Sequence, residues 1–216
     1  AALAAEIEDV HADPRGLIGR LTSVIDAAGT LFRFRAAIED RDGRQVMELL
    51  DAGRVDDDGR ISALYTFAEP LARAGSRSAP GDELAARTAT TPVTPIELAV
   101  RRYVAAWTER DPAARRALLE ACFAADGRLV GRGRTYRGRA ELAALMDQLL
   151  ADRNGVTIRL TSVIDAAGSA FRIGSEGQFG DGSAAFEALD VGEVDGDGRI
   201  AVLHAFAGTL APAPAT

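Results

Sequence analysis

Apolar and polar positions alternate through two stretches of this chain, and Asp-Gly pairs typical of hairpin turns lie between successive runs. The first stretch predicts one meander of strands and the second predicts another. The strands expected are Leu17–Ala27, Leu31–Ile38, Val46–Val55 and Arg60–Ala68, then Arg128–Val130, Val156–Ala167, Ala170–Phe179, Ala184–Val194 and Arg199–Ala207.

Helical spacing marks four other segments. Thr94-Pro95-Ile96-Glu97 has an N-cap residue, a proline at the first helical position and an acid three residues after the cap. The stripe Ile96, Val100, Tyr103 and Trp107 then predicts one buried face. A second helix is expected from Asp111-Pro112 to Phe123, a third over Ala140–Ala151, with a loop at Gly131–Gly138, and a helix at Ala1–Ala12.

The ten residues RLTSVIDAAG occur twice, at Arg20–Gly29 and at Arg159–Gly168. A shift of 139 positions (160 minus 21) aligns residues 1–68 with 140–207 without a gap, and about half of the pairs are identical. Thr94–Arg139 has no counterpart in the first copy. The sequence therefore predicts a tandem repeat in which one module is whole and the other lacks its front part.

These patterns predict an α+β protein of two cone-like modules, each a curved antiparallel sheet packed against helices. Residues 1–70 would form the incomplete module and residues 94–210 the complete one. Residues 71–93 collect Ser, Thr, Pro and Gly and are expected to be a linker, with one helical turn at Glu83–Arg87. A helix layer over a bent sheet would enclose a pocket.

Composition narrows the classes of function. The net charge of −7 disfavours nucleic acid and anionic membranes as partners. Cys122 is the single cysteine, and the two histidines, His11 and His204, lie far apart in sequence, so we expect neither a disulfide, a zinc site nor another metal or cofactor. No apolar run approaches the length of a membrane span, and a cytoplasmic location is the expectation.

Three motifs resemble the SnoaL-like and nuclear-transport-factor-2-like superfamily, which includes ketosteroid isomerase, polyketide cyclases and limonene epoxide hydrolase. They are RYVAAWTERD at 102–111, TYRGRAEL at 135–142 and ALDVGEVDGDGRI at 188–200. The resemblance covers Thr94–Gly208, and residues 1–68 match only its back part. It implies the cone fold and leaves the reaction open, because the superfamily hosts several chemistries and non-catalytic binding proteins.

The isomerase branch of that superfamily implies roles for three positions. A helix tyrosine and a protonated strand aspartate that donate to an oxyanion fall on Tyr103 and Asp190, while the position of the general base falls on Gly131. Without that base, steroid isomerase activity is not expected. A pocket that binds a polarised carbonyl could remain.

Each candidate also has a structural reading. Tyr103 could be a core aromatic, and Asp190 could bond loop backbone, since its counterpart Asp51 lies in a module with no equivalent of Tyr103. His204 is a catalytic candidate beside Asp190 and Tyr103, although strand alternation places it with Val202, away from the face of Ala201, Leu203 and Ala205.

The remaining polar motifs have simpler interpretations. Arg172 and its counterpart Arg33 could be pocket cations or members of surface ion pairs, and Asp165 and Asp26 are expected to cap turns. Asp195-Gly196-Asp197-Gly198 lacks the closing glutamate of a calcium loop and is expected to be a hairpin turn. The glycines near 131 and 174 do not have the spacing of a nucleotide loop or a nucleophile elbow.

The leading hypothesis is a protein that binds a small apolar ligand in the second module. The expected lining is Tyr103, Trp107, Phe123, Tyr136, Phe186, Asp190 and Leu203. One alternative is an isomerase, cyclase or hydrolase acting on a polyketide-like or terpenoid ring, with Asp190 as acid or base. Another is a non-catalytic module that forms an intramolecular pseudo-dimer or a homodimer through sheet faces such as Leu189, Val191, Leu50 and Ala52.

The incomplete module should expose apolar surface, because half a cone cannot close its sheet over a helix layer. We expect either that about 45 residues precede Ala1, by analogy with Thr94–Arg139, or that another chain covers this surface.

Overall fold

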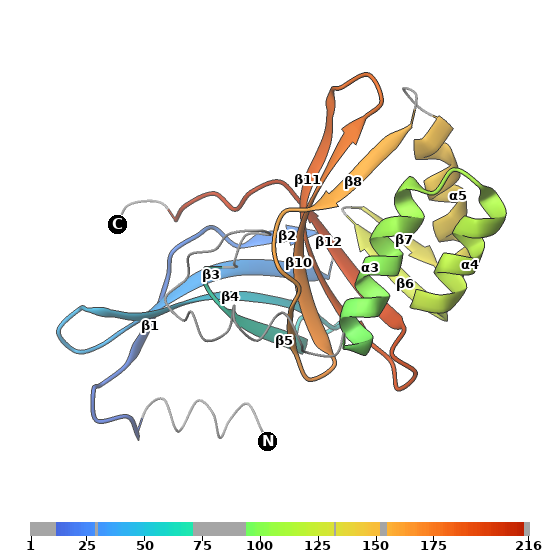
Figure 1. The fold of residues 1–216 in the computed structure, drawn as a ribbon. Coiled ribbons are helices and arrows are strands. Elements are labelled where there is room, and N and C mark those ends of the chain that lie inside the picture. Colours follow the sequence, from blue (N-terminus) through green and yellow to red (C-terminus); the bar gives the residue numbers. More distant parts are fainter. Residues whose placement is uncertain (1–11, 29, 71–93, 132, 152–154, 214–216) are drawn as a thin grey trace. The chain divides into compact units, whose positions relative to one another are not determined.

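The computed structural model describes residues 12–28, 30–70, 94–131, 133–151 and 155–213 (Figure 1). They fall into two compact units. The first comprises Ala1–Pro70 together with Leu210–Thr216, and the second comprises Leu71–Thr209. The helix expected at Ala1–Ala12 lies outside the described residues except for Ala12, and the expected linker at 71–93 lies wholly outside them.

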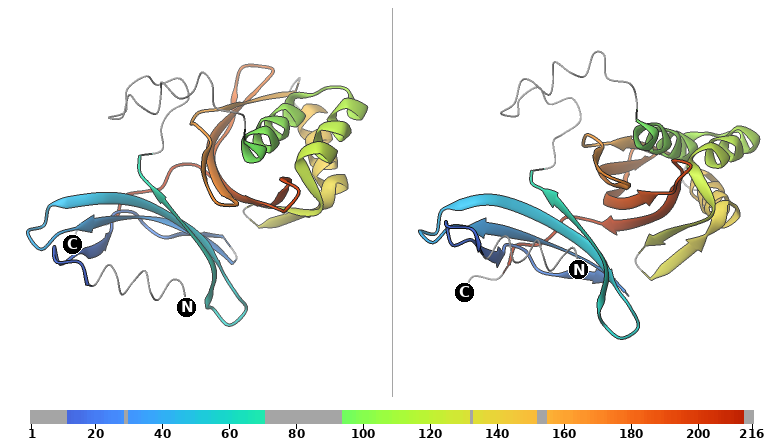
Figure 2. Two further views of the ribbon diagram at one scale, coloured as in Figure 1. Left: turned by 60° about the horizontal axis from the view of Figure 1, so that its bottom comes forward. Right: turned by 90° about the horizontal axis from the view of Figure 1, so that it is seen from below.

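The first unit contains a bent antiparallel sheet in the order β1-β3-β4-β5, with β2 paired to β3 (Figure 2). A segment from the far end of the chain adds to it: Val24 donates its backbone N–H to the carbonyl of Ala211 at 3.0 Å, and Ala213 donates to Thr22 at 3.0 Å. The strands are β1 (Ile18–Leu21), β2 (Asp26–Ala28), β3 (Leu31–Glu39), β4 (Gln45–Val55) and β5 (Ile61–Ala68).

The second unit packs three helices against one face of a seven-stranded sheet, in the order β7-β6-β12-β11-β10-β8 with β9 paired to β10 (Figure 2). This confirms the α+β class. One pairing differs from the antiparallel expectation, because β6 runs parallel to β12. The elements are α3 (Pro95–Thr108), α4 (Pro112–Cys122), β6 (Phe123–Gly131), β7 (Arg134–Arg137), α5 (Gly138–Ala151), β8 (Val156–Leu160), β9 (Asp165–Ala167), β10 (Ala170–Phe179), β11 (Ala184–Val194) and β12 (Ile200–Ala207).

The helix starts follow the predicted caps. The Thr94 hydroxyl accepts the backbone N–H of Glu97 at 3.1 Å, and the Asp111 carboxylate accepts those of Ala113 and Ala114. Each cap satisfies backbone donors that a first helical turn leaves open. The apolar stripe of α3 is buried as expected, and Val100 on it is fully enclosed.

Each unit breaks one predicted strand in two. In the second unit, β8 ends at Leu160 opposite Ser175, and β9 begins at Asp165 opposite Arg172, so the four residues 161–164 face the two residues 173 and 174. The Ser162 hydroxyl bridges the gap by accepting the N–H of Gly174 at 2.7 Å. Ser23 does the same for Arg35 between β1 and β2, also at 2.7 Å. A side chain thus replaces a ladder hydrogen bond at both breaks.

Buried arginines accompany both breaks. Arg172 is 1% exposed and its Nε lies 2.8 Å from the Asp165 carboxylate, while Arg33 is 2% exposed and pairs with Asp26 at 2.9 Å. The prediction of a surface pair or a pocket cation was therefore wrong for both arginines. The prediction that Asp165 and Asp26 merely cap turns was also wrong, because each supplies the countercharge of an enclosed guanidinium.

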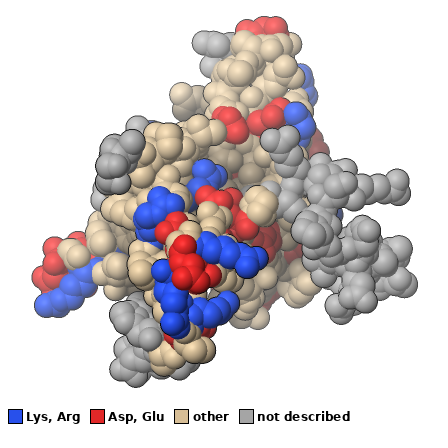
Figure 3. Space-filling view, turned by 90° about the vertical axis from the view of Figure 1, so that its left-hand side faces the viewer, with Lys and Arg blue, Asp and Glu red and all other residues tan. Residues whose placement is uncertain are grey.

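The surface of the first unit carries both charged and large apolar side chains. Basic and acidic side chains are intermixed on the face drawn in Figure 3. In the first unit, Arg20 pairs with Glu39 at 2.6 Å. Several large apolar side chains of this unit are exposed. They are Ile18, Leu21, Val24, Ile25, Val46, Met47 and Ile61.

Candidate functional site

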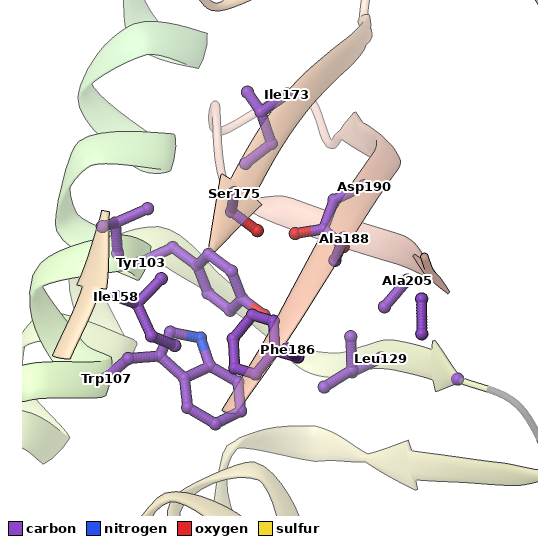
Figure 4. A pocket seen from close by; sticks show the side chains of 13 residues that line it. Tyr103, Trp107, Leu129, Ile158, Ile173, Ser175, Phe186, Ala188, Asp190 and Ala205 are labelled. Atoms are coloured by element: carbon purple, nitrogen blue, oxygen red, sulfur yellow. The ribbon is translucent and has the colours of Figure 1, made fainter. Parts of the chain in front are cut away.

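A cavity of about 240 Å³ lies between α3 and the inner face of the sheet in the second unit (Figure 4). Strands β6, β8, β10, β11 and β12 supply its other walls. Carbon-rich side chains make up most of the lining. The residues are Tyr103, Val104, Trp107, Leu129, Gly131, Ile158, Ile173, Ser175, Phe186, Ala188, Asp190, Ala205 and Ala207.

Three aromatic rings form one side of the cavity. Tyr103 and Trp107 are one turn apart on α3, so helix geometry places both on the face that meets the sheet. Their ring centroids are 5.9 Å apart and the rings are perpendicular. Phe186 approaches from β11 (Figure 4) and lies over Gly177, where an added Cβ would come within 2.5 Å of its ring. The absence of a side chain at Gly177 therefore allows this ring position.

The polar side of the cavity is a carboxyl and a hydroxyl. Asp190 pairs with Ile173 across β11 and β10, and Ser175 is the next residue on the same face of β10. Their oxygens point toward one another in Figure 4, and both residues are buried. Burial raises the pKa of Asp190 from 3.8 to about 7, although the hydrogen bond from Ser175 lowers it. Asp190 thus changes charge near neutral pH.

The Tyr103 phenol stays protonated. Burial raises its pKa well above the usual value, the negative charge of Asp190 raises it further, and a hydrogen bond with Trp107 lowers it. The site therefore offers a permanent phenol donor and a carboxyl that switches between donor and acceptor.

The two basic residues nearest in the sheet face the other way. Arg172 and His204 both pair with Val191, on either side of β11. Since successive residues of a strand point to opposite faces, these side chains lie on the face opposite to Asp190. His204 is 5% exposed and is not among the lining residues. The structure brings Tyr103 and Asp190 together and leaves His204 outside the cavity.

Three predicted lining residues lie elsewhere. Phe123 is fully buried and stacks on the Tyr103 ring at 6.4 Å, so it supports the wall without forming it. Tyr136 sits on the edge strand β7, with the Arg134 guanidinium 4.6 Å from its ring. Leu203 is enclosed opposite Gly192, and it fills the interior where that glycine leaves space. Trp107, Phe186, Tyr103 and Asp190 do line the cavity.

Sequence reasoning missed Ser175. The residues around Ser175 do not have the spacing of a nucleophile elbow, but strand alternation puts Ser175 on the face of Phe171 and Ile173, both fully buried. The signal in the sequence that could have identified Ser175 is a serine on an otherwise apolar strand face. The small residue Ala188 was missed as well, whereas Ala205 lies on the strand face that was expected to border the pocket; both leave space because their side chains are small.

Comparison with known proteins identifies the second unit. Residues 100–203 match the family model described as SnoaL-like domain. The second unit is a SnoaL-like domain. The match confirms the resemblance that the three sequence motifs indicated. No curated protein matches the chain.

Several solved structures are similar to about half of this chain. A protein of the SnoaL-like family from Agrobacterium tumefaciens is 24% identical over 53% of this chain and 98% of its own, with a TM-score of 0.49. An NTF2-like protein of unknown function from Exiguobacterium is 17% identical over 51% and 98%, with a TM-score of 0.42. An LEH-like epoxide hydrolase from M. tuberculosis is 23% identical over 53% and 82%, with a TM-score of 0.41.

The general-base position that the resemblance implied is a cavity wall in this SnoaL-like domain. Gly131 ends β6 and lines the space, and an added Cβ would meet only the Arg134 carbonyl oxygen at 3.9 Å. The domain has room for a side chain there, and the sequence supplies none. Asp190 is the one carboxyl among the described residues of the lining.

The first unit holds its counterpart carboxyl differently from the SnoaL-like domain. The Thr66 hydroxyl on β5 donates to Asp51 at 2.6 Å, and burial raises the pKa of Asp51 while this bond lowers it. In the repeat alignment, Thr66 corresponds to Ala205 (66 plus 139), and Ser175 corresponds to Ala36 (175 minus 139). The hydroxyl partner of Asp51 lies on β5, whereas the hydroxyl partner of Asp190 lies on β10, which corresponds to β3 in the first unit. The two carboxyls therefore accept from opposite neighbouring strands.

The hairpin that resembles part of a calcium loop is a turn. One Asp195 carboxylate oxygen accepts the N–H of Asp197 and that of Arg199, both at 2.9 Å. Among the residues that the structure describes, no cluster of three His, Cys, Asp or Glu side chains is arranged to hold a metal ion. No helix in the described ranges has the length and apolar character needed to cross a bilayer.

Proposed function

We propose that the SnoaL-like domain binds a small, largely apolar molecule in the cavity and anchors it through Asp190. The observation that carries this proposal is a hollow with apolar walls and one buried carboxyl. Such a combination is typical of ligand sites, where apolar contacts supply affinity and a few polar groups fix orientation. The volume of about 240 Å³ lies just below the roughly 300–1,000 Å³ of sites for drug-sized ligands, which suits a compact molecule.

The charge of the lining restricts the ligand further. Asp190 is the only charged side chain among the described residues of the lining, and these include no Lys, Arg or His. An anionic group would have no counterion in the cavity and would face the Asp190 carboxylate at the upper end of the neutral range. Carboxylates and phosphates are therefore disfavoured as ligands.

Filling the cavity should abolish binding. Ala188 lines the cavity, so the larger side chain of Ala188→Leu would occupy the space of a ligand. Ala184→Leu is the control, because Ala184 lies on the same strand, is exposed and does not line the cavity. Trp107 is the only tryptophan and lines the cavity. Its fluorescence should respond when small cyclic compounds are titrated into the wild type and the Ala184 variant, and not in the Ala188 variant.

Equal responses of both variants would place binding elsewhere. Circular dichroism and thermal unfolding of each variant would establish that the SnoaL-like domain is still folded. If no member of a panel of small cyclic compounds changed the Trp107 signal of the wild type, ligand binding in this cavity would be refuted.

A second candidate function is proton transfer on a bound ring, favoured by the pKa of Asp190 near 7. A carboxyl with a pKa near the working pH can take up and return a proton efficiently. We expect cyclic ketones incubated in heavy water at pH 8 to exchange a carbon-bound hydrogen, with exchange slowed about 100-fold or more by Asp190→Asn. Asp51→Asn is the control, and equal exchange in wild type and both variants, measured by mass spectrometry, would exclude catalysis by Asp190.

A further inference from the structure

The cavity combines one carboxyl with the faces and edges of three aromatic rings. Tyr103, Trp107 and Phe186 gather on one side, and Asp190 lies on the other side beside Ser175 (Figure 4). Aromatic faces attract cations through the negative charge density above the ring, and tryptophan does so most strongly. A carboxylate attracts the same cation through its full charge. Both features of the lining thus favour a positively charged group.

Among the residues that the structure describes, none supplies that positive charge inside the cavity. The groups that face Asp190 are Tyr103 from α3, Ser175 from β10 and Ala205 from β12, and none of them is cationic. Arg172 and His204 lie on the opposite face of the sheet, and Arg172 pairs with Asp165. The ionised carboxyl of Asp190 therefore has a hydrogen bond from Ser175 and no cationic neighbour among the described lining residues.

We propose that the ligand of this cavity is a small hydrophobic amine, bound as the ammonium ion between the Asp190 carboxylate and the rings of Tyr103, Trp107 and Phe186. This inference rests on the proposed binding function and specifies its ligand class. The ammonium N–H groups donate to the carboxylate oxygen that Ser175 leaves free. The apolar part of the amine packs on Leu129, Ile158 and Ile173.

The affinity of such a ligand depends on pH in a definite direction. The ammonium ion binds the ionised form of Asp190, so binding below the pKa of that carboxyl must displace a proton. Affinity should rise about tenfold per pH unit up to about pH 7, and then level off until the amine itself loses its proton. A neutral ligand that accepts a hydrogen bond from the acid form would show the opposite trend.

The test uses cyclohexylmethylamine and cyclohexylmethanol, which have the same shape and differ in charge. Trp107 fluorescence reports binding of either compound to the full chain. We expect the amine to bind at least tenfold more tightly than the alcohol at pH 8. We also expect the amine to bind about 100-fold more weakly at pH 5 than at pH 8, while the affinity of the alcohol changes little.

Variants locate the effect. Asp190→Asn should reduce the affinity of the amine to that of the alcohol, and Asp51→Asn, the counterpart in the first unit, should leave the preference intact. Equal binding of the two compounds by the wild type, or tighter binding of the alcohol, would overturn the amine assignment and leave the proposed binding function standing. If neither compound bound at millimolar concentration, both the amine assignment and the binding function would be contradicted.

Discussion

Replacing Asp190 with asparagine should stabilise the second unit at pH 8 and leave its stability nearly unchanged at pH 4. The pKa of this carboxyl is 3.8 when it is exposed and about 7 in the folded protein, because burial disfavours the charged form. Between these values the folded state binds more protons than the unfolded state, so the stability of the wild type falls as the pH rises.

The size of the effect follows from the difference between the two pKa values of Asp190, 3.8 and about 7. At about 1.4 kcal/mol per pH unit, the cost of ionising Asp190 accumulates to about 4 kcal/mol above pH 7. Asparagine has a similar shape and carries no charge, and the Ser175 hydroxyl can donate to it or accept from it. The variant should therefore show a higher melting temperature than the wild type from pH 6 upward.

Calorimetric unfolding between pH 4 and pH 9 would measure this difference. Asp57→Asn is a suitable control because Asp57 is exposed in the β4–β5 hairpin, and the same exchange there should change little. A wild-type protein whose stability relative to Asp190→Asn is the same at pH 4 and pH 8 would show that Asp190 does not titrate with a raised pKa.

Removing the Asp165 carboxylate should strongly destabilise the same unit. Arg172 is 1% exposed, and its guanidinium lies 2.8 Å from Asp165. Removing one partner of a buried ion pair typically costs about 3–5 kcal/mol, whereas removing both charges is often much less harmful. We expect about 3 kcal/mol for Asp165→Ala, near the lower limit because Asp165 itself is 38% exposed.

The double variant Asp165→Ala, Arg172→Met distinguishes charge from packing. It should be more stable than Asp165→Ala alone, since methionine fills much of the arginine volume without a charge. Urea unfolding followed by Trp107 fluorescence reports this unit directly, because the only tryptophan lies on α3. A loss below 1 kcal/mol for Asp165→Ala, or a double variant less stable than the single one, would contradict the electrostatic explanation.

The sequence predicts local features of this fold well. Capping residues fixed the starts of α3 and α4, since Thr94 and Asp111 satisfy backbone groups within a few residues of themselves. Alternation placed His204 on the correct face of β12. The interruption between β8 and β9 was not predicted, because it depends on Ser162 bonding Gly174 across twelve residues of chain. The sequence predicts a loop where β7 lies, because β7 is defined by its pairing with β6 and has no pattern of its own.

The candidate site was predicted in part. Trp107 was recognised from the apolar stripe of its helix, and Tyr103 and Asp190 were recognised through the resemblance to the isomerase branch. Leu203 shares the face of Ala205 by alternation, yet it is packed into the core while Ala205 borders the cavity. That difference arises from the depth of each residue along the bent sheet, which a repeat of two residues does not encode. Ser175 was missed because its role in the site depends on its hydrogen bond to Asp190 on the neighbouring strand.

The hydrogen bonds of Val24 and Ala213 make the first unit discontinuous in sequence, because its edge includes residues 210–213 from the far end of the chain. These residues follow the whole second unit in the sequence, so they are synthesised after it. The sheet of the first unit can thus complete this edge only after the second unit has been made, which couples the folding of the first unit to the synthesis of the second.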